Sequence, residues 1–204
     1  MKFKYLIIGI FIALIGTIEY LFFDSVLSSV ILILSMIIAL FFISLEYIEY
    51  SKGSNITKTV LCYILKDDKV LLIKKAYKEN DMNSNKYMGV GGHIEENESI
   101  DDAILREVKE ETNLTLTSYN LLGEVKFYMN NEYKEKIYVY LGYDVKGEIK
   151  ASDEGELEFV KKDEIYNLPM WEGDKIFLNP LFNEKKFKCS LYYNEEKLIN
   201  YKIK

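Results

Sequence analysis

The chain begins with two long apolar runs and then changes to a mixed pattern of apolar and charged positions. The first run covers residues 5–23 and carries a charge only at Glu19, and the second covers residues 26–45 without any charge. Each is about 20 residues long, the length that an α-helix needs to cross the hydrocarbon core of a bilayer. The pattern predicts that residues 1–50 form a transmembrane helical hairpin with a polar turn at Asp24 and Ser25.

The charges that flank these runs predict the orientation of the hairpin. Lys2 and Lys4 precede the first run, whereas the turn carries no Lys or Arg. Because Lys and Arg favour the cytoplasmic side, we expect both ends of the hairpin in the cytoplasm. A cleaved signal peptide and a pair of soluble core helices are the alternatives, and the lack of a small-residue cleavage site argues against the first. We therefore expect a cell-membrane protein with two spans, whose residues 1–50 contact the lipid bilayer.

After residue 50 the pattern predicts a linker at residues 51–55 and one compact α/β domain at residues 56–204. Helices are expected from Ser99 to near Thr112 and at residues 173–181, with a helical turn at residues 163–168. Alternation of strands and helices predicts a mixed sheet between helical layers. Residues 87–94 are expected to lead through their glycines into the helix at Ser99. The short apolar runs typical of strands lie at residues 58–65, 70–75, 119–128, 136–145, 156–160, 186–193 and 197–203.

The helix expected after Ser99 has well-defined ends and an inward face. Ser99 is a favourable N-cap, and Asp102 completes a capping box with it. Asn113 follows the predicted end and suits the left-handed conformation that closes a helix. The inward face is an apolar stripe of three residues spaced four apart, Ile100, Ile104 and Val108.

A second face of this helix carries Glu107, Glu110 and Glu111, which lie at helical neighbour positions. Their like charges repel one another there. A hard divalent cation removes the repulsion, and Mg²⁺ binds a few carboxylates while it also coordinates phosphates. Arg106 lies four residues before Glu110 and can hold it by charge-assisted hydrogen bonds. The spacing therefore predicts a metal site for phosphate chemistry.

These residues form part of a longer motif that resembles the Nudix box. The motif runs from Gly92 through Glu98 and the segment 106–111 to Leu114, with Asn113 in place of a final glycine. The resemblance covers about residues 56–204. It implies a Nudix α/β/α sandwich with a mixed sheet, preceded here by two transmembrane helices. It also implies a hydrolase that cleaves a nucleoside diphosphate linked to another group.

The resemblance implies a role for each motif residue. Mg²⁺, or Mn²⁺ in its place, would be held by the Gly92 carbonyl, three glutamates of the helix and one distant glutamate. Glu98 would support the loop, and Arg106 would orient a glutamate. A carboxylate, Glu107, Glu110 or Glu111, would deprotonate or position the attacking water. The carboxylate ligands implied are Glu107, Glu110, Glu111 and Glu154.

Segments downstream of the motif resemble those of 8-oxo-dGTP diphosphatases of the MutT type. They are Ser152–Val160, residues 168–174 with the sequence LPMWEGD, and the C-terminal hairpin. By this resemblance Trp171 would stack on a purine, Asp174 would hydrogen-bond its edge, and Lys74 or Lys75 would reach a phosphate. The alternatives are that Trp171 belongs to the core, that Asp174 caps a helix and that Glu154 is a surface residue.

Composition narrows the remaining choices. A net charge of −6 argues against a general nucleic-acid binder, which would present a basic patch. Cys62 and Cys189 lack metal-ligand spacing and are expected to be reduced core residues. Other substrates remain alternatives: ADP-ribose or another nucleotide sugar, a dinucleoside polyphosphate or an RNA 5′ end. So does a non-catalytic, membrane-anchored nucleotide-binding domain. The motif leaves the base, the number of metal ions and the oligomeric state open.

Overall fold

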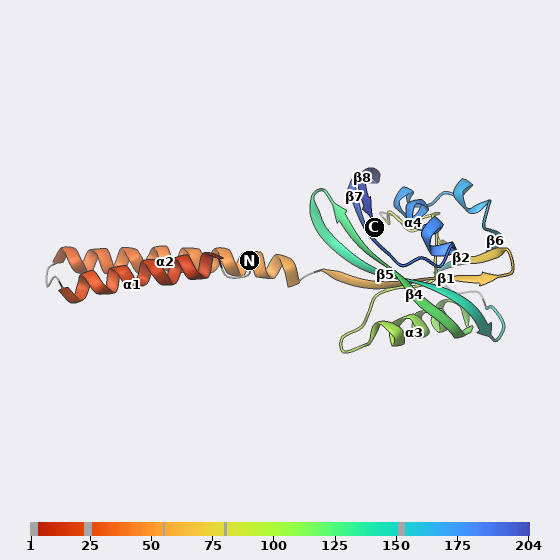
Figure 1. Cartoon of the computed structure of the whole chain (residues 1–204), viewed down its shortest axis with the longest axis horizontal. Coiled ribbons are helices and arrows are strands. Elements are labelled where there is room, and N and C mark those ends of the chain that lie inside the picture. Colours follow the sequence, from red (N-terminus) through yellow and green to blue (C-terminus); the bar gives the residue numbers. More distant parts are fainter. Residues whose placement is uncertain (1–3, 23–25, 55, 80, 151–153) are drawn as a thin grey trace. The chain divides into compact units, whose positions relative to one another are not determined.

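The computed structural model of the protein describes residues 4–22, 26–54, 56–79, 81–150 and 154–204 (Figure 1). The chain divides into two compact units, Met1–Ile56 and Thr57–Lys204. The predicted turn at Asp24 and Ser25 lies outside the described residues, as do Phe23, Asn55, Ser152 and Asp153.

Two helices form the first unit, α1 (Lys4–Phe22) and α2 (Val26–Ser54). Among the described residues, α2 alone contains a stretch long and apolar enough to cross a membrane, Val26–Ile48. The apolar stretch of α1, Tyr5–Ile18, is shorter. One of the two predicted spans thus has a helix of sufficient length, and the pair of spans remains a prediction.

The linker predicted at residues 51–55 differs from the structure, in which α2 continues to Ser54. The polar composition of this segment suggested a break, but polar residues do not by themselves end a helix. Extending an existing helix is much easier than starting one, and a single glycine costs only about 1 kcal/mol relative to alanine. Gly53 is therefore tolerated within the last turns of α2.

The two helices of the first unit meet through small residues and expose large ones. A Cβ added at Gly16 would collide with the Ser35 hydroxyl, so the two backbones approach closely there. The Tyr5 backbone N–H donates a hydrogen bond of 2.9 Å to the Glu46 carboxylate. The large apolar side chains of both helices are exposed, whereas a soluble protein buries most side chains of this kind. The exposed apolar residues include Ile7, Phe11, Leu14, Leu40 and Phe41.

The second unit is built on one eight-stranded sheet with the order β3-β2-β1-β5-β4-β7-β8, and β6 pairs with β2. The pairs β1–β5 and β4–β7 are parallel and the others are antiparallel, which confirms the predicted mixed sheet. The strands are β1 (Thr57–Lys66), β2 (Lys69–Lys75), β3 (Tyr87–Met88), β4 (Thr115–Met129), β5 (Glu132–Lys146), β6 (Gly155–Lys161), β7 (Phe187–Asn194) and β8 (Lys197–Ile203).

Helices cover both faces of this sheet, as the predicted α/β/α sandwich requires (Figure 1). Helix α3 (Ile100–Thr112) lies on one face, and α4 (Glu172–Phe182) lies on the other, after the short helical turn η1 (Ile165–Asn167). Each face has its own hydrophobic core. The two cysteines are free and buried, as expected.

Residues 87–94, which were expected to lead into α3, form mostly a loop. Only Tyr87–Met88 is a strand, and single bridges join Val90 to Cys62 and His93 to Thr59. A Cβ at Gly89 would lie 2.8 Å from the Cys62 carbonyl oxygen. The glycines therefore let this loop run close against β1, where it leads into α3.

Candidate active site

Both ends of α3 are closed as the sequence predicts. The Ser99 hydroxyl accepts a hydrogen bond of 3.1 Å from the Asp102 backbone N–H. Asn113 adopts the left-handed conformation, with φ of 62°, and its N–H donates to the Lys109 carbonyl at 2.9 Å. Because Asn is the usual second choice after Gly in this conformation, the departure from the motif leaves the helix end intact.

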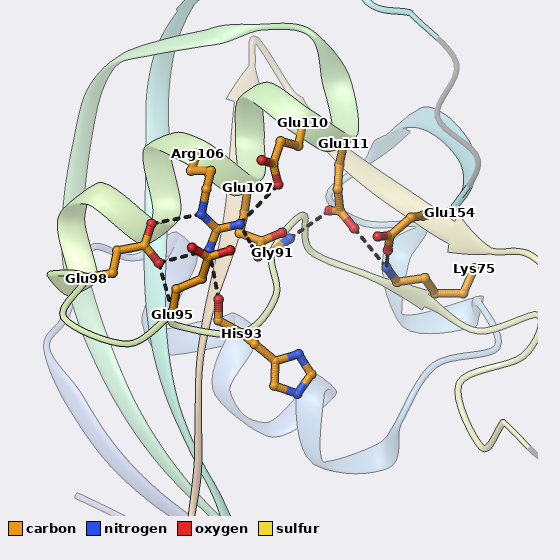
Figure 2. Close-up of polar contacts among 10 residues, drawn as sticks. All are labelled: Lys75, Gly91, His93, Glu95, Glu98, Arg106, Glu107, Glu110, Glu111 and Glu154. Atoms are coloured by element: carbon orange, nitrogen blue, oxygen red, sulfur yellow. Dashed lines mark hydrogen bonds and ion pairs between the residues drawn. The ribbon is translucent and has the colours of Figure 1, made fainter.

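Arg106 connects the outer glutamates of the site to the loop that precedes α3 (Figure 2). Its Nε and Nη2 donate to the two Glu98 carboxylate oxygens at 2.8 and 2.9 Å. Nη1 donates to Glu107 at 2.8 Å and to Glu110 at 3.1 Å, and Nη2 also donates to the His93 carbonyl at 2.9 Å. Hydrogen bonding to Arg106 lowers the pKa of Glu98. Arg106 was expected to orient one glutamate, and it contacts three.

Lys75 binds the glutamates at the other end of the row (Figure 2). Its Nζ lies 2.8 Å from Glu111 and 2.5 Å from Glu154. The second Glu111 oxygen accepts the Gly91 backbone N–H at 2.9 Å. Burial raises the pKa of Glu111 to about 7, although Lys75 opposes this rise. The hydrogen bond from Lys75 lowers the pKa of Glu154.

The Gly92 position is built for the approach of Glu107. A Cβ added at Gly92 would lie 2.5 Å from a Glu107 carboxylate oxygen, so a side chain there would displace the glutamate. Burial raises the pKa of Glu107. The Gly92 carbonyl accepts the Val60 N–H at 2.9 Å, which leaves only its second lone pair for the predicted metal contact.

The donor set of this site fits a hard divalent cation. Five carboxyl groups, those of Glu98, Glu107, Glu110, Glu111 and Glu154, share two cations, Arg106 and Lys75. Carboxylate oxygens are the ligands that Mg²⁺ prefers. Among the described residues, no three His, Cys, Asp or Glu side chains already stand close enough to hold a metal ion. The glutamates are instead turned toward the arginine and the lysine.

A cavity of about 800 Å³ opens beside these carboxylates. Its far wall is aromatic. Trp171 meets Tyr193 edge to face with 5.1 Å between ring centroids, and Phe127 lies 6.2 Å from Trp171. The indole N–H donates to the Asn83 side chain at 2.8 Å, and Lys86 lies 4.6 Å above the indole ring. A cavity with both apolar walls and convergent polar groups is typical of a small-molecule site.

Two carboxyl groups stand at the aromatic end of the cavity. Asp174 is only 8% exposed, and burial, aided by the charge of Glu135, raises its pKa to about 7. Glu135 accepts a hydrogen bond of 2.7 Å from the Thr59 hydroxyl. Asp174 does not act as the cap of α4, because the N-cap position is Trp171 and no side chain caps the helix.

The structure separates the two lysines that the sequence could not distinguish. Lys75 lines the cavity, whereas Lys74 stacks over the Tyr87 ring at 5.9 Å. Trp171, Asp174 and Glu154 line the same cavity as the motif residues. The sequence did not point to several other residues of the cavity lining. Glu135 lies on the same face of β5 as Ile137, which also lines the cavity. Four of these residues matter below. They are Thr59, Asn83, Phe127 and Glu135.

Comparison with known proteins identifies the family. Residues 56–180 match the NUDIX domain. The chain belongs to the NUDIX family. This Nudix hydrolase is 23% identical over 147 residues to the oxidized purine nucleoside triphosphate hydrolase of Mus musculus. The match covers 71% of this chain and 92% of the mouse protein. It is 35% identical over 108 residues to the ADP-ribose pyrophosphatase of Methanocaldococcus jannaschii, and this match covers 52% of this chain and 60% of that protein.

A solved structure supports the same assignment. The MutT protein of Bacillus halodurans superimposes with a TM-score of 0.65 at 28% identity, over 72% of this chain and 97% of that one. The Nudix fold thus covers the second unit. Nudix hydrolases generally need a divalent metal, and the glutamates on α3 are the residues of this Nudix enzyme that suit one.

Proposed function

We propose that this Nudix hydrolase is a Mg²⁺-dependent nucleoside triphosphate diphosphatase that acts on 8-oxo-dGTP or a related oxidised purine nucleotide. The observation that carries the proposal is the continuity of one cavity. Glu107, Glu154 and Lys75 line the part that we call the phosphate end, and Trp171 and Asp174 line the part that we call the base end. A nucleotide needs such a site, because its phosphates require cations and its base requires an aromatic surface with polar groups at the edge.

At the phosphate end, Glu107, Glu110 and Glu111 would hold Mg²⁺ or Mn²⁺, with Glu154 and the Gly92 carbonyl as further ligands. The bound ion would neutralise the phosphate oxygens and the charge that develops at phosphorus. Glu107 or Glu110 would take a proton from the attacking water. The water oxygen would bond to phosphorus as the phosphoanhydride bond breaks, and the products would be a nucleoside monophosphate and pyrophosphate.

The positions of the cations assign roles around this step. Arg106 holds Glu98 through two hydrogen bonds and the loop through the His93 carbonyl, so it would fix the orientation of Glu107 and Glu110. Lys75 lines the cavity and would reach a phosphate once Glu111 and Glu154 bind the metal ion in its place. Lys74 points to Tyr87, so we assign it no phosphate contact.

A second candidate is hydrolysis of ADP-ribose. The relative from Methanocaldococcus jannaschii carries that activity in its name and is 35% identical over 108 residues. The motif glutamates would serve either substrate. The base end favours an oxidised purine, because Trp171 and Asp174 lie in the segment that resembles 8-oxo-dGTP diphosphatases.

We also propose that residues 1–50 anchor the enzyme in the cell membrane as two spans, with the Nudix domain in the cytoplasm. The support is the exposure of large apolar side chains on α1 and α2, together with the length of Val26–Ile48. Protease treatment of intact and opened spheroplasts tests the orientation. The Nudix domain should be cleaved only after the spheroplasts are opened. Cleavage in intact spheroplasts would show that the domain faces outward.

The substrate proposal is tested with the full-length protein in detergent micelles. Wild type and Glu110→Gln would be assayed against 8-oxo-dGTP, dGTP, ADP-ribose and a dinucleoside polyphosphate, with and without Mg²⁺. The proposal predicts selective, metal-dependent pyrophosphate release from 8-oxo-dGTP that the substitution abolishes. Preferential turnover of ADP-ribose would establish the second candidate instead.

A further inference from the structure

The proposed purine-binding role of Trp171 and Asp174 leaves one carboxyl group at the base end of the cavity unexplained, that of Glu135. Asp174 is 8% exposed and lines the cavity, and its carboxylate accepts no hydrogen bond within the described part of the chain. Its oxygens are open to the cavity and suit a ligand that supplies hydrogen-bond donors.

Glu135 adds a second carboxyl group from a different element. It lies in β5 directly opposite Phe127 of β4, so it stands beside the aromatic wall. Its Oε1 accepts the Thr59 hydroxyl at 2.7 Å, and Thr59 is itself buried in β1. This bond fixes the carboxyl group at the cavity lining and leaves its other oxygen for a ligand.

A carboxylate that meets N7 of the bound purine distinguishes oxidised from unoxidised bases. An ionised carboxylate accepts hydrogen bonds and donates none. N7 of an unoxidised purine is also an acceptor, and two acceptors in contact repel each other. Oxidation at C8 places a proton on N7, which converts that acceptor into a donor.

We propose that Glu135, held by Thr59, is a specificity-determining residue that works beside Asp174 and selects purines with a protonated N7 over unoxidised ones. This inference rests on the proposed function and names the residue that provides its selectivity. The raised pKa of Asp174, to which Glu135 contributes, agrees with two carboxyl groups that influence each other across the pocket.

Glu135→Gln tests the proposal without disturbing the fold. The amide oxygen still accepts the Thr59 hydroxyl, and the side chain keeps its shape. The amide nitrogen, however, can donate to the N7 of an unoxidised purine. Thr59→Val is a second variant, which removes the bond that fixes Glu135. The matched control is Glu132→Gln, on the same strand but outside the cavity lining.

The experiment measures kcat/KM for 8-oxo-dGTP and dGTP with the full-length protein in micelles. The wild-type preference for 8-oxo-dGTP should fall roughly 10- to 100-fold in Glu135→Gln. This is the effect of losing one charge-assisted hydrogen bond that only the oxidised base makes. Part of the fall should come from faster dGTP turnover. Thr59→Val should move the preference in the same direction by less, and Glu132→Gln should leave it unchanged.

A binding measurement separates selectivity from turnover. Trp171 is the only tryptophan of the chain and lies in the cavity, so its fluorescence reports occupancy. Titration with 8-oxo-dGMP and dGMP in EDTA should show the same loss of preference in Glu135→Gln. An unchanged preference in both assays would overturn the role of Glu135 alone. A wild type that shows no preference for 8-oxo-dGTP would overturn the proposed function, and this inference with it.

Discussion

The two ends of the cavity both carry carboxyl groups, but they balance the charge differently. At the phosphate end, Arg106 and Lys75 contact five glutamates. At the base end, Glu135 is held by a neutral hydroxyl, and neither it nor Asp174 has an ion pair in the described residues. The same chemical group is therefore placed in two electrostatic environments within one cavity.

The difference separates two kinds of recognition. Five carboxyl groups against two cations leave an excess of negative charge at the phosphate end, which favours the binding of a divalent metal ion. Burial raises the pKa of Asp174 to about 7, as it does that of Glu111, but in the described part of the chain Asp174 has no cation beside it and gains instead from neutral N–H donors. One cavity can thus bind a polyanion at one end and a neutral heterocycle at the other.

The largest effect should follow from removing a carboxylate at the phosphate end. Glu107→Gln keeps the shape of the side chain but removes the charge beside Gly92. We expect kcat/KM to fall roughly 10²- to 10⁴-fold, as for loss of a general base or metal contact. Steady-state kinetics with saturating Mg²⁺ checks this, and Glu132→Gln should retain wild-type rates. Near-normal rates in Glu107→Gln would remove this residue from the chemistry.

At the base end, Asp174→Asn should change how stability depends on pH. The folded pKa of Asp174 is about 7, above its usual value of 3.8, so the folded state binds the extra proton between these values. Wild-type stability should therefore decrease as the pH rises from 4 to 7, by roughly 2–4 kcal/mol. Asp174→Asn should show a smaller decrease, because the raised pKa of Glu111 contributes to it in both proteins. Urea unfolding followed by Trp171 fluorescence at pH 5 and pH 8 measures both, and equal pH dependence would contradict the account.

Arg106→Lys should show that the phosphate end needs a planar fork and not only a positive charge. Lysine cannot bind both Glu98 oxygens and the His93 carbonyl together. We expect kcat/KM to fall roughly 10- to 100-fold, as when a residue that orients a metal ligand is lost. The thermal midpoint, read from Trp171, should decrease as well. Full activity in this variant would mean that charge alone suffices.

Lys75→Met should tighten metal binding, because Lys75 competes with the metal for Glu111 and Glu154. At pH 8.5 we expect the Kd for Mn²⁺ to fall about tenfold, which corresponds to about 1.4 kcal/mol. The EPR signal of free Mn²⁺ measures this without substrate. Lys74→Met is the matched control, because Lys74 faces the Tyr87 ring, and it should leave the Kd unchanged. A weaker affinity in Lys75→Met would show that lysine supports the metal.

The phosphate end could be predicted from sequence because its signals are local. Ser99, Asn113 and the glutamate spacing belong to one helix, and its geometry follows from neighbouring residues. The base end depends on partners far apart in the chain. Glu135 meets Thr59 only through the parallel pairing of β1 with β5. One feature of the phosphate end is of the same kind, because the choice between Lys74 and Lys75 depends on the face of β2 that each lysine occupies. Such register-dependent contacts leave little trace in a single sequence.

The most direct test of this division is 8-oxo-dGTP turnover by the full-length protein across a Mg²⁺ titration, for wild type, Glu110→Gln and Asp174→Asn. The account predicts no turnover without metal, a strong loss of rate in Glu110→Gln at every Mg²⁺ concentration, and an unchanged Mg²⁺ midpoint in Asp174→Asn with weaker substrate affinity. Turnover that needs no metal, or a Mg²⁺ midpoint that moves equally in both variants, would contradict the separation of the two ends.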